Sequence, residues 1–242
     1  MVKLKDLQPV RELPQKLIQT PTFLNGDSPK QLADLFFPQY EQLSQKHDSF
    51  RLRRTGDSNP LVTGLVNKVF ADNGNKFRTP TPTDDIYQTI FPMIKDKFYT
   101  DLNAFDVWDW TEESYELNKQ IWEQLLDLAK TDGVTKFPFR IQGFYCTPDD
   151  SEPTYQVRIE PANNFKVIQS DKLNYSGRFS GLDKDGLCIP SEKGFTKYTL
   201  GNAVSGVFLG SGGDLGYDNY HLAGSIDFGR VIAIDAEGVG KK

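Results

Sequence analysis

The stretch from residue 108 to residue 146 changes its hydrophobic rhythm once, and this change constrains the fold more than any other feature. Thr111 is placed to cap the start of a helix, and Gly133 is placed to end it in the left-handed conformation. Between them, apolar residues recur at three- and four-residue spacing, which puts them on one helical face: Tyr115, Ile121, Trp122, Leu125, Leu126 and Ala129. After Gly133, apolar and polar residues alternate from Lys136 to Gly143, which predicts a half-buried strand.

Upstream of this change, the sequence predicts an arm and then helices. Three prolines in residues 1–24 prevent one long helix there, so we expect an extended arm that lies on an apolar surface. Ser28 begins a capping box, and apolar residues between 61 and 70 predict a short second helix. Thr83 is placed to cap a third helix, which Pro92 interrupts and whose apolar residues recur four apart: Ile86, Ile90, Ile94, Phe98 and Leu102.

Downstream of Gly133, short strands alternate with turns. The expected strands are residues 154–160, 165–169, 175–179, 195–200, 204–209 and 230–236. Strands at this spacing are typical of an antiparallel sandwich or barrel. The sequence therefore predicts an α+β fold, with an N-terminal helical half followed by a C-terminal antiparallel β-sandwich or barrel. Its regions would be an arm (1–24), a helical region (25–133) and a β-rich region (134–242).

Composition excludes several classes of protein. The formal net charge of −5 is a poor match for nucleic acid, and no apolar segment approaches the roughly 18 residues that span a bilayer. Two cysteines, Cys146 and Cys188, exclude a disulfide-dense scaffold and a four-cysteine zinc site. We expect two buried, reduced thiols, with a disulfide between them as the alternative. The expected location is the cytoplasm, or an assembly formed there.

Four carboxylates near the C-terminus are the candidate metal ligands. Asp235 and Glu237 are two apart on an expected strand, so they share a face and could hold one cation. This Asp-x-Glu resembles the opening motif of DEDD-type exonucleases, although only five residues follow Glu237. Asp214, Asn219 and Asp227 resemble the pattern of aminoglycoside phosphotransferases and kinases, in which an aspartate is the base and an asparagine and a second aspartate bind magnesium, although the interval from Asn219 to Asp227 is short. Together the four would support a metal-dependent hydrolase or nuclease with a divalent cation.

Nucleophilic catalysis has little support in the sequence. The only histidines are His47 and His221, so the options for a Cys/His pair are Cys146 or Cys188 with His221. Cys146 ends an expected strand instead of beginning a helix, where its pKa would fall. We therefore expect no catalytic residues and no cofactor, with the divalent cation as the alternative.

Tyrosines gather in the expected β region, and Tyr217, Tyr220 and His221 fall in one loop-like stretch that could contact a sugar or a protein. Without an intact catalytic group, the sequence favours a non-catalytic structural or interaction protein. It could be a subunit of a larger, virion-like assembly, with a protein partner or self-association. A carbohydrate- or protein-binding β-domain and the metal-dependent hydrolase are the alternatives.

Overall fold

The computed structural model describes residues 22–24, 58–110, 116–149, 157–198, 203–218, 222 and 229–235. Strands dominate these residues, and three of the helices are interleaved with strands before residue 110. In chain order the elements are β1 (Thr22–Leu24), α2 (Pro60–Asp72), β2 (Phe77–Arg78), α3 (Ile86–Thr89), α4 (Phe91–Ile94), β3 (Thr100–Val107), α5 (Glu116–Thr131), β4 (Phe139–Pro148), β5 (Val157–Gln169), η3 (Asp171–Asn174), β6 (Gly177–Leu182), β7 (Cys188–Pro190), β8 (Phe195–Lys197), β9 (Val204–Leu209), β10 (Leu215–Asp218) and β11 (Val231–Asp235).

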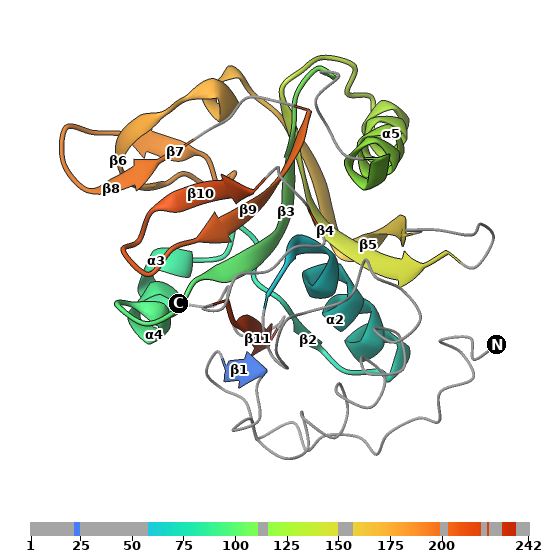
Figure 1. Ribbon diagram of the computed structural model, residues 1–242, viewed down its shortest axis with the longest axis horizontal. Coiled ribbons are helices and arrows are strands. Elements are labelled where there is room, and N and C mark those ends of the chain that lie inside the picture. Colours follow the sequence, from blue (N-terminus) through green and yellow to red (C-terminus); the bar gives the residue numbers. More distant parts are fainter. Residues whose placement is uncertain are drawn as a thin grey trace.

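The strands form two sheets (Figure 1). The larger sheet has eight strands in the order β5-β4-β3-β9-β10-β8-β6-β7, and the smaller has three in the order β1-β11-β2. Every pairing is antiparallel except β8 with β10. The large sheet has two open edges, β5 and β7, so it is not a closed barrel.

The core is divided by β3, which contributes to both of its clusters. Phe105 and Val107 pack with α2, α5 and β4, whereas Leu102 and Ala104 pack with α3, α4, β9 and β10. In Figure 1, α2 and α5 accordingly lie on one side of β3, and α3 and α4 on the other. All eight residues of β3 are buried. This strand therefore has protein on both of its faces.

Helix α2 is defined by local signals at both ends. Asn59 is its N-cap, and the Asn59 Oδ1 accepts a hydrogen bond from the Val62 amide at 2.8 Å. Pro60 follows in the first turn, where a missing N–H costs nothing. The helix packs closely on β4, because a Cβ added to Gly64 would lie 2.7 Å from the Cys146 Cβ.

The helix and strand around Gly133 are confirmed as elements, but residues 139–144 of the strand are all buried, so the prediction that it is half-buried is wrong. Helix α5 covers residues 116–131, Gly133 has φ +82°, and β4 begins at Phe139. The Gly133 amide donates to the Lys130 carbonyl at 3.0 Å and the Val134 amide to the Ala129 carbonyl at 2.8 Å, which is a Schellman ending. The proposed cap, Thr111, lies outside the described residues.

The predicted N-terminal helical half is wrong. The expected helix from Thr83 to Leu102 is replaced by two four-residue helices, α3 and α4, and by the central strand β3. Pro92 stands at the start of α4, and Asp96 takes a positive φ of 61°, so the helical path ends before Thr100. A strand buried on both faces need not alternate apolar and polar residues, which is why periodicity did not reveal β3.

The predicted C-terminal sandwich or barrel is also wrong. Strands from both parts of the chain form one open sheet, in which β3 lies between β4 and β9. The small sheet likewise pairs β11 with β1 and β2, from residues before 80. Sequence-distant pairing of this kind is decided by which strands share a core, and local patterns do not report it. No helix in the described part of the chain is both long and apolar enough to cross a membrane.

Candidate ligand-binding site

The predicted metal ligands fall in two different sheets or outside the described residues. Asp214 lies in the β9–β10 turn of the large sheet, where its Oδ1 accepts from the Thr196 amide at 3.0 Å. Asp235 ends β11 in the small sheet. Asp227 and Glu237 lie outside the described residues. Within the residues described, no group of three metal-ligating side chains is present, and the four-carboxylate site stays a prediction.

The predicted partner-binding residues are described only at one position. Tyr217 belongs to β10, where it is opposite Val207 of β9. Tyr220 and His221 lie outside the described residues. Binding of a partner through this stretch therefore stays a prediction.

Both cysteines are free and buried, as expected. Burial raises the pKa of the Cys146 thiol well above its ordinary value. Burial also raises the pKa of Cys188 to about 11, although nearby Lys197 and Arg140 act in the opposite direction. Both thiols are therefore protonated at neutral pH, which disfavours a role as nucleophile because the thiolate is the reactive form.

Charged side chains are buried at the centre of the large sheet, and we call Arg140, Asp106 and Lys197 the buried ion cluster. Arg140 holds Asp106 in a fork, with Nε to Oδ1 at 2.5 Å and Nη2 to Oδ2 at 2.9 Å. Its Nη1 donates to the Gly186 carbonyl at 2.7 Å. Lys197 Nζ donates to the Leu173 carbonyl at 2.7 Å, and burial lowers its pKa.

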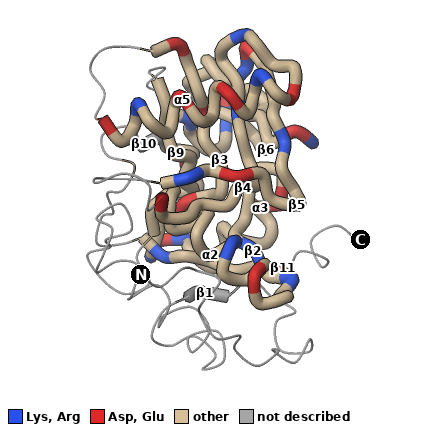
Figure 2. The backbone as a smooth tube through the Cα atoms, turned by 90° about the vertical axis from the view of Figure 1, so that its right-hand side faces the viewer, with Lys and Arg blue, Asp and Glu red and all other residues tan. Residues whose placement is uncertain are grey.

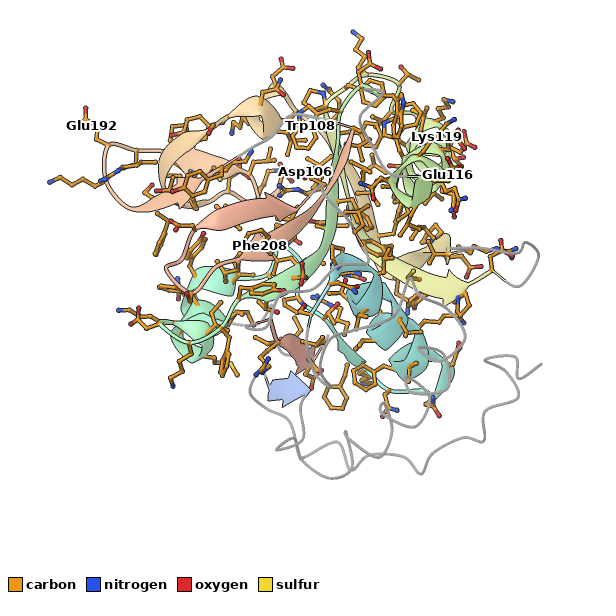
Figure 3. The ribbon with its side chains drawn as sticks, viewed as in Figure 1. Asp106, Trp108, Glu116, Lys119, Glu192 and Phe208 are labelled. Carbon is orange, nitrogen blue, oxygen red and sulfur yellow. The ribbon has the colours of Figure 1, made fainter. Side chains whose placement is uncertain are left out.

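This cluster is structural. Asp106 lies in the interior of the molecule, whereas Glu192 extends from its edge (Figure 3). The exposed fractions of the Arg140 and Asp106 side chains are 1% and 0%, so no ligand can reach the pair. Its hydrogen bonds join β3, β4, β8, η3 and the β6–β7 turn. A buried pair of this kind specifies which elements meet.

An open cavity of about 530 Å³ lies where the end of α2, the turn into β2, and the β4–β5 hairpin meet. We call it the asparagine pocket. Its lining residues are Asn67, Ala71, Gly74, Asn75, Lys76, Phe77, Arg78, Tyr145, Ala162, Asn163 and Asn164. Four of these residues carry side-chain amides, which both donate and accept hydrogen bonds.

One wall of the pocket is a bulge in β5. The register of β4 against β5 shifts between Gln142 and Phe144: only Gly143 lies between these pairs on β4, whereas residues 162–165 lie between them on β5. Gly143 has φ +71°, and a Cβ there would lie 2.4 Å from the Asn164 carbonyl oxygen. Bulges redirect side chains out of the regular alternation. This one carries three of the lining residues.

The C-terminal end of α2 and the turn after it also line the pocket. Gly74 takes φ +67°, its amide donates to the Ala71 carbonyl at 3.0 Å, and the Asn75 amide donates to the Phe70 carbonyl at 2.9 Å. This Schellman ending closes the helix and reverses the chain toward β2. As a result, Asn75 and Lys76 lie at the mouth of the pocket.

The floor of the pocket is fixed by Asn67, which is 3% exposed. Its Oδ1 accepts from the Thr79 amide at 2.7 Å and from the Thr79 hydroxyl at 3.0 Å. Its Nδ2 donates to the Phe144 carbonyl at 3.4 Å. This side chain therefore joins α2, the end of β2 and β4, and it keeps the walls of the pocket in place.

Charges beside the pocket are largely compensated. Arg78 forks onto Asp84, with both N–O distances at 2.6 Å. Lys68 is 2.5 Å from Asp72 and lies over the Tyr145 ring, 5.8 Å from its centre. Figure 2 shows basic and acidic positions next to one another at the end of the molecule where α2, β2 and β11 lie. The pocket is therefore polar without a strong net field.

Sequence reasoning missed this pocket. It separated residues 154–160 from 165–169 as two strands. The structure joins these two segments into one strand, β5, with the bulge between them. The adjacent Asn163 and Asn164 inside a strand pattern are the signal for such a bulge, because asparagine is unfavourable in regular strands.

The lining consists mainly of amides and apolar side chains, with Lys76, Arg78 and the Tyr145 phenol. Its described residues include no carboxylate, imidazole, thiol or aliphatic hydroxyl, the groups that most often transfer protons or attack substrates. Amides, one phenol and two cationic side chains can hold a polar ligand by hydrogen bonds. Comparison with protein families, with curated proteins and with solved structures finds no match to this chain.

Proposed function

We propose that this protein is a non-catalytic binding protein that holds a small polar ligand in the asparagine pocket. The observation that carries this proposal is the β5 bulge, whose Asn163 and Asn164 line a cavity of about 530 Å³ together with Asn75. Small-molecule sites in proteins have volumes on the order of 300–1,000 Å³.

Preorganisation supports the proposal. Asn67 ties three elements around the floor, and the ending at Gly74 sets the turn that carries Asn75. A wall that is already ordered loses little conformational entropy when a ligand binds. The lining is therefore ordered before a ligand binds, which lowers the entropic cost of binding.

The other polar centre of the molecule supports a non-catalytic role. Arg140, Asp106 and Lys197 make their hydrogen bonds within the fold and are buried. The two thiols are buried and protonated at neutral pH. Among the described residues, this cluster and the two cysteines are therefore engaged in the fold, which supports the proposal.

A ligand screen with two matched variants tests the proposal. Asn163 and Gln169 are both exposed amides on β5, but only Asn163 lines the pocket. We expect a library of sugars, nucleotides, amino acids and organic acids, screened by ligand-observed NMR, to contain a saturable ligand. Its affinity in calorimetry should fall about tenfold in Asn163→Ala, the equivalent of one lost hydrogen bond, and stay unchanged in Gln169→Ala. No ligand, or equal loss in both variants, would contradict the proposal.

Two more specific functions stay predictions. If the protein is a subunit of a larger, virion-like assembly, we expect its mass in solution to be a multiple of the 27.4 kDa mass of one chain. Light scattering measures this mass. A metal-dependent hydrolase requires a divalent cation at the C-terminal carboxylates. Calorimetry with Mg²⁺ and Mn²⁺ on the wild type and on Asp235→Asn checks that requirement.

A further inference from the structure

We infer that the ligand of the asparagine pocket is a neutral carbohydrate, a mono- or disaccharide. This inference rests on the proposed function and adds the chemical class of the ligand. It follows from three properties of the lining: which hydrogen-bonding groups it presents, which apolar surfaces accompany them, and how its charges are balanced.

The hydrogen-bonding groups match adjacent hydroxyls. Asn163 and Asn164 belong to the β5 bulge and Asn75 to the α2–β2 turn, and all three line the cavity; the Asn75 Nδ2 also donates to the Asn73 carbonyl at 3.3 Å. Each amide offers an N–H donor and a carbonyl acceptor in one plane. A sugar presents hydroxyls that donate and accept on neighbouring carbons, so one amide can bind two of them. Amides from two different segments of the chain can therefore bind more than one pair of hydroxyls on the same ring.

The apolar parts of the lining match the C–H faces of a sugar. Tyr145 from β4 is half-buried and carries its own hydroxyl. Phe77 from β2 is 9% exposed, and Ala71 and Ala162 lie on the two walls. An amphipathic ring beside small apolar side chains fits a ligand that is itself polar at its edges and apolar on its faces.

The balance of charges argues against a phosphorylated or otherwise charged ligand. Protein sites for phosphate typically use helix N-termini and open arginine forks. Here α2 presents its C-terminal end, which carries a partial negative charge of about −0.5, and the Arg78 fork is occupied by Asp84 at 2.6 Å. Lys76 can also donate hydrogen bonds to sugar hydroxyls. A ligand without net charge fits these surroundings best.

Calorimetry with matched sugars tests the inference. The neutral probes are glucose, lactose, cellobiose, maltose and N,N′-diacetylchitobiose, and the charged probes are glucose 6-phosphate, glucuronic acid and glucosamine. We expect at least one neutral probe to bind saturably and more tightly than every charged probe. Its affinity should fall about tenfold in both Asn163→Ala and Tyr145→Ala, with Gln169→Ala unchanged.

The outcomes separate the inference from the proposed function. If a ligand of another class binds and Asn163→Ala weakens it, the pocket binds ligands but the carbohydrate assignment is wrong. If a charged probe binds more tightly than the neutral ones, the charge argument is wrong. If neither the sugars nor the wider library bind, both are wrong. Far-UV circular dichroism of each variant identifies any loss of binding that comes from unfolding.

Discussion

The buried ion cluster and the asparagine pocket are both polar, and they use opposite chemistry. The cluster consists of full charges that are sealed inside the sheet, with the Arg140–Asp106 fork 1% and 0% exposed. The pocket presents neutral amides at a bulge, in an open cavity of about 530 Å³. Strand β4 connects the two, because it carries Arg140 near its start and Tyr145 beyond Gly143.

The comparison distinguishes polar groups that stabilise the fold from polar groups that remain available to bind a ligand. Removing charges from water costs several kcal/mol per ion, and the cost is offset only by excellent geometry inside the protein. Charged groups that are buried and paired with each other are not available to bind a ligand. Amides at the surface cost little to leave solvated, so they can exchange water for a ligand. The following predictions test this division, beginning with the largest effect.

Breaking the buried ion pair should have the largest effect on stability. Arg140→Met leaves the Asp106 carboxylate buried and unpaired, which we expect to lower the free energy of unfolding by about 3–5 kcal/mol in urea denaturation. The control is Arg158→Met, whose pair with Asp149 is 3.4 Å long with the arginine side chain 56% exposed. That change should stay within about 0.5 kcal/mol. Similar losses in both variants would contradict the structural role of the cluster.

Crowding the contact between α2 and β4 should have the next largest effect. Gly64→Ala places a Cβ 2.7 Å from the Cys146 Cβ and 2.9 Å from its amide nitrogen. We expect overpacking to lower the free energy of unfolding by about 1–3 kcal/mol and to weaken ligand binding, because α2 is one wall of the pocket. Gly181→Ala is the control, since a Cβ there meets nothing within 4 Å. Unchanged stability in Gly64→Ala would contradict the close packing.

The buried thiol beside the cluster should make stability depend on alkaline pH. Burial raises the pKa of Cys188 from 9.0 to about 11, so between these values the unfolded chain loses this proton before the folded chain does. The contribution of Cys188 to the free energy of unfolding is therefore fully present below pH 9. Above pH 9 this contribution falls, by at most about 1.4 kcal/mol per pH unit. Lys197, whose pKa is lowered by burial, acts in the opposite direction as pH rises toward 10.5. Urea denaturation of the wild type and Cys188→Ala from pH 8 to 11 should show a flatter decline in the variant; parallel curves would refute this.

Removing an amide from the pocket should have the smallest effect on stability. Asn163 is exposed and belongs to the bulge, so Asn163→Ala should change the free energy of unfolding by no more than about 0.5 kcal/mol. Its effect should appear in ligand affinity instead. A loss of stability near that of Arg140→Met would mean that the bulge serves folding, and the comparison between the two regions would fail.

Local features of this fold could be predicted from the sequence. Gly133, the apolar stripe of Trp122 and Leu125, and the alternation after Lys136 predicted α5 and β4. The turn after α2 was also predictable, because glycine accepts the positive φ found at Gly74. In each case, the residues that decide the structure are within a few positions of one another.

The central strand and the pocket were decided by the tertiary structure. Strand β3 carries Asn103 and Asp106, which would be unfavourable in a buried strand without distant partners. The Phe144 amide donates to Asn103 Oδ1 at 2.7 Å, and Arg140 pairs with Asp106, so only the folded chain supplies what these residues need. The pocket likewise requires the end of α2 and the β5 bulge to meet.

The sequence by itself therefore determined where α5, β4 and the turn after α2 form, because the apolar patterns and glycines that specify them lie within a few residues of one another. Only the tertiary structure decided that β3 joins the sheet, that charges are buried at its centre, and that asparagines from distant segments line one cavity. These features depend on contacts between residues far apart in the chain, whose free energy exists only once the core has assembled.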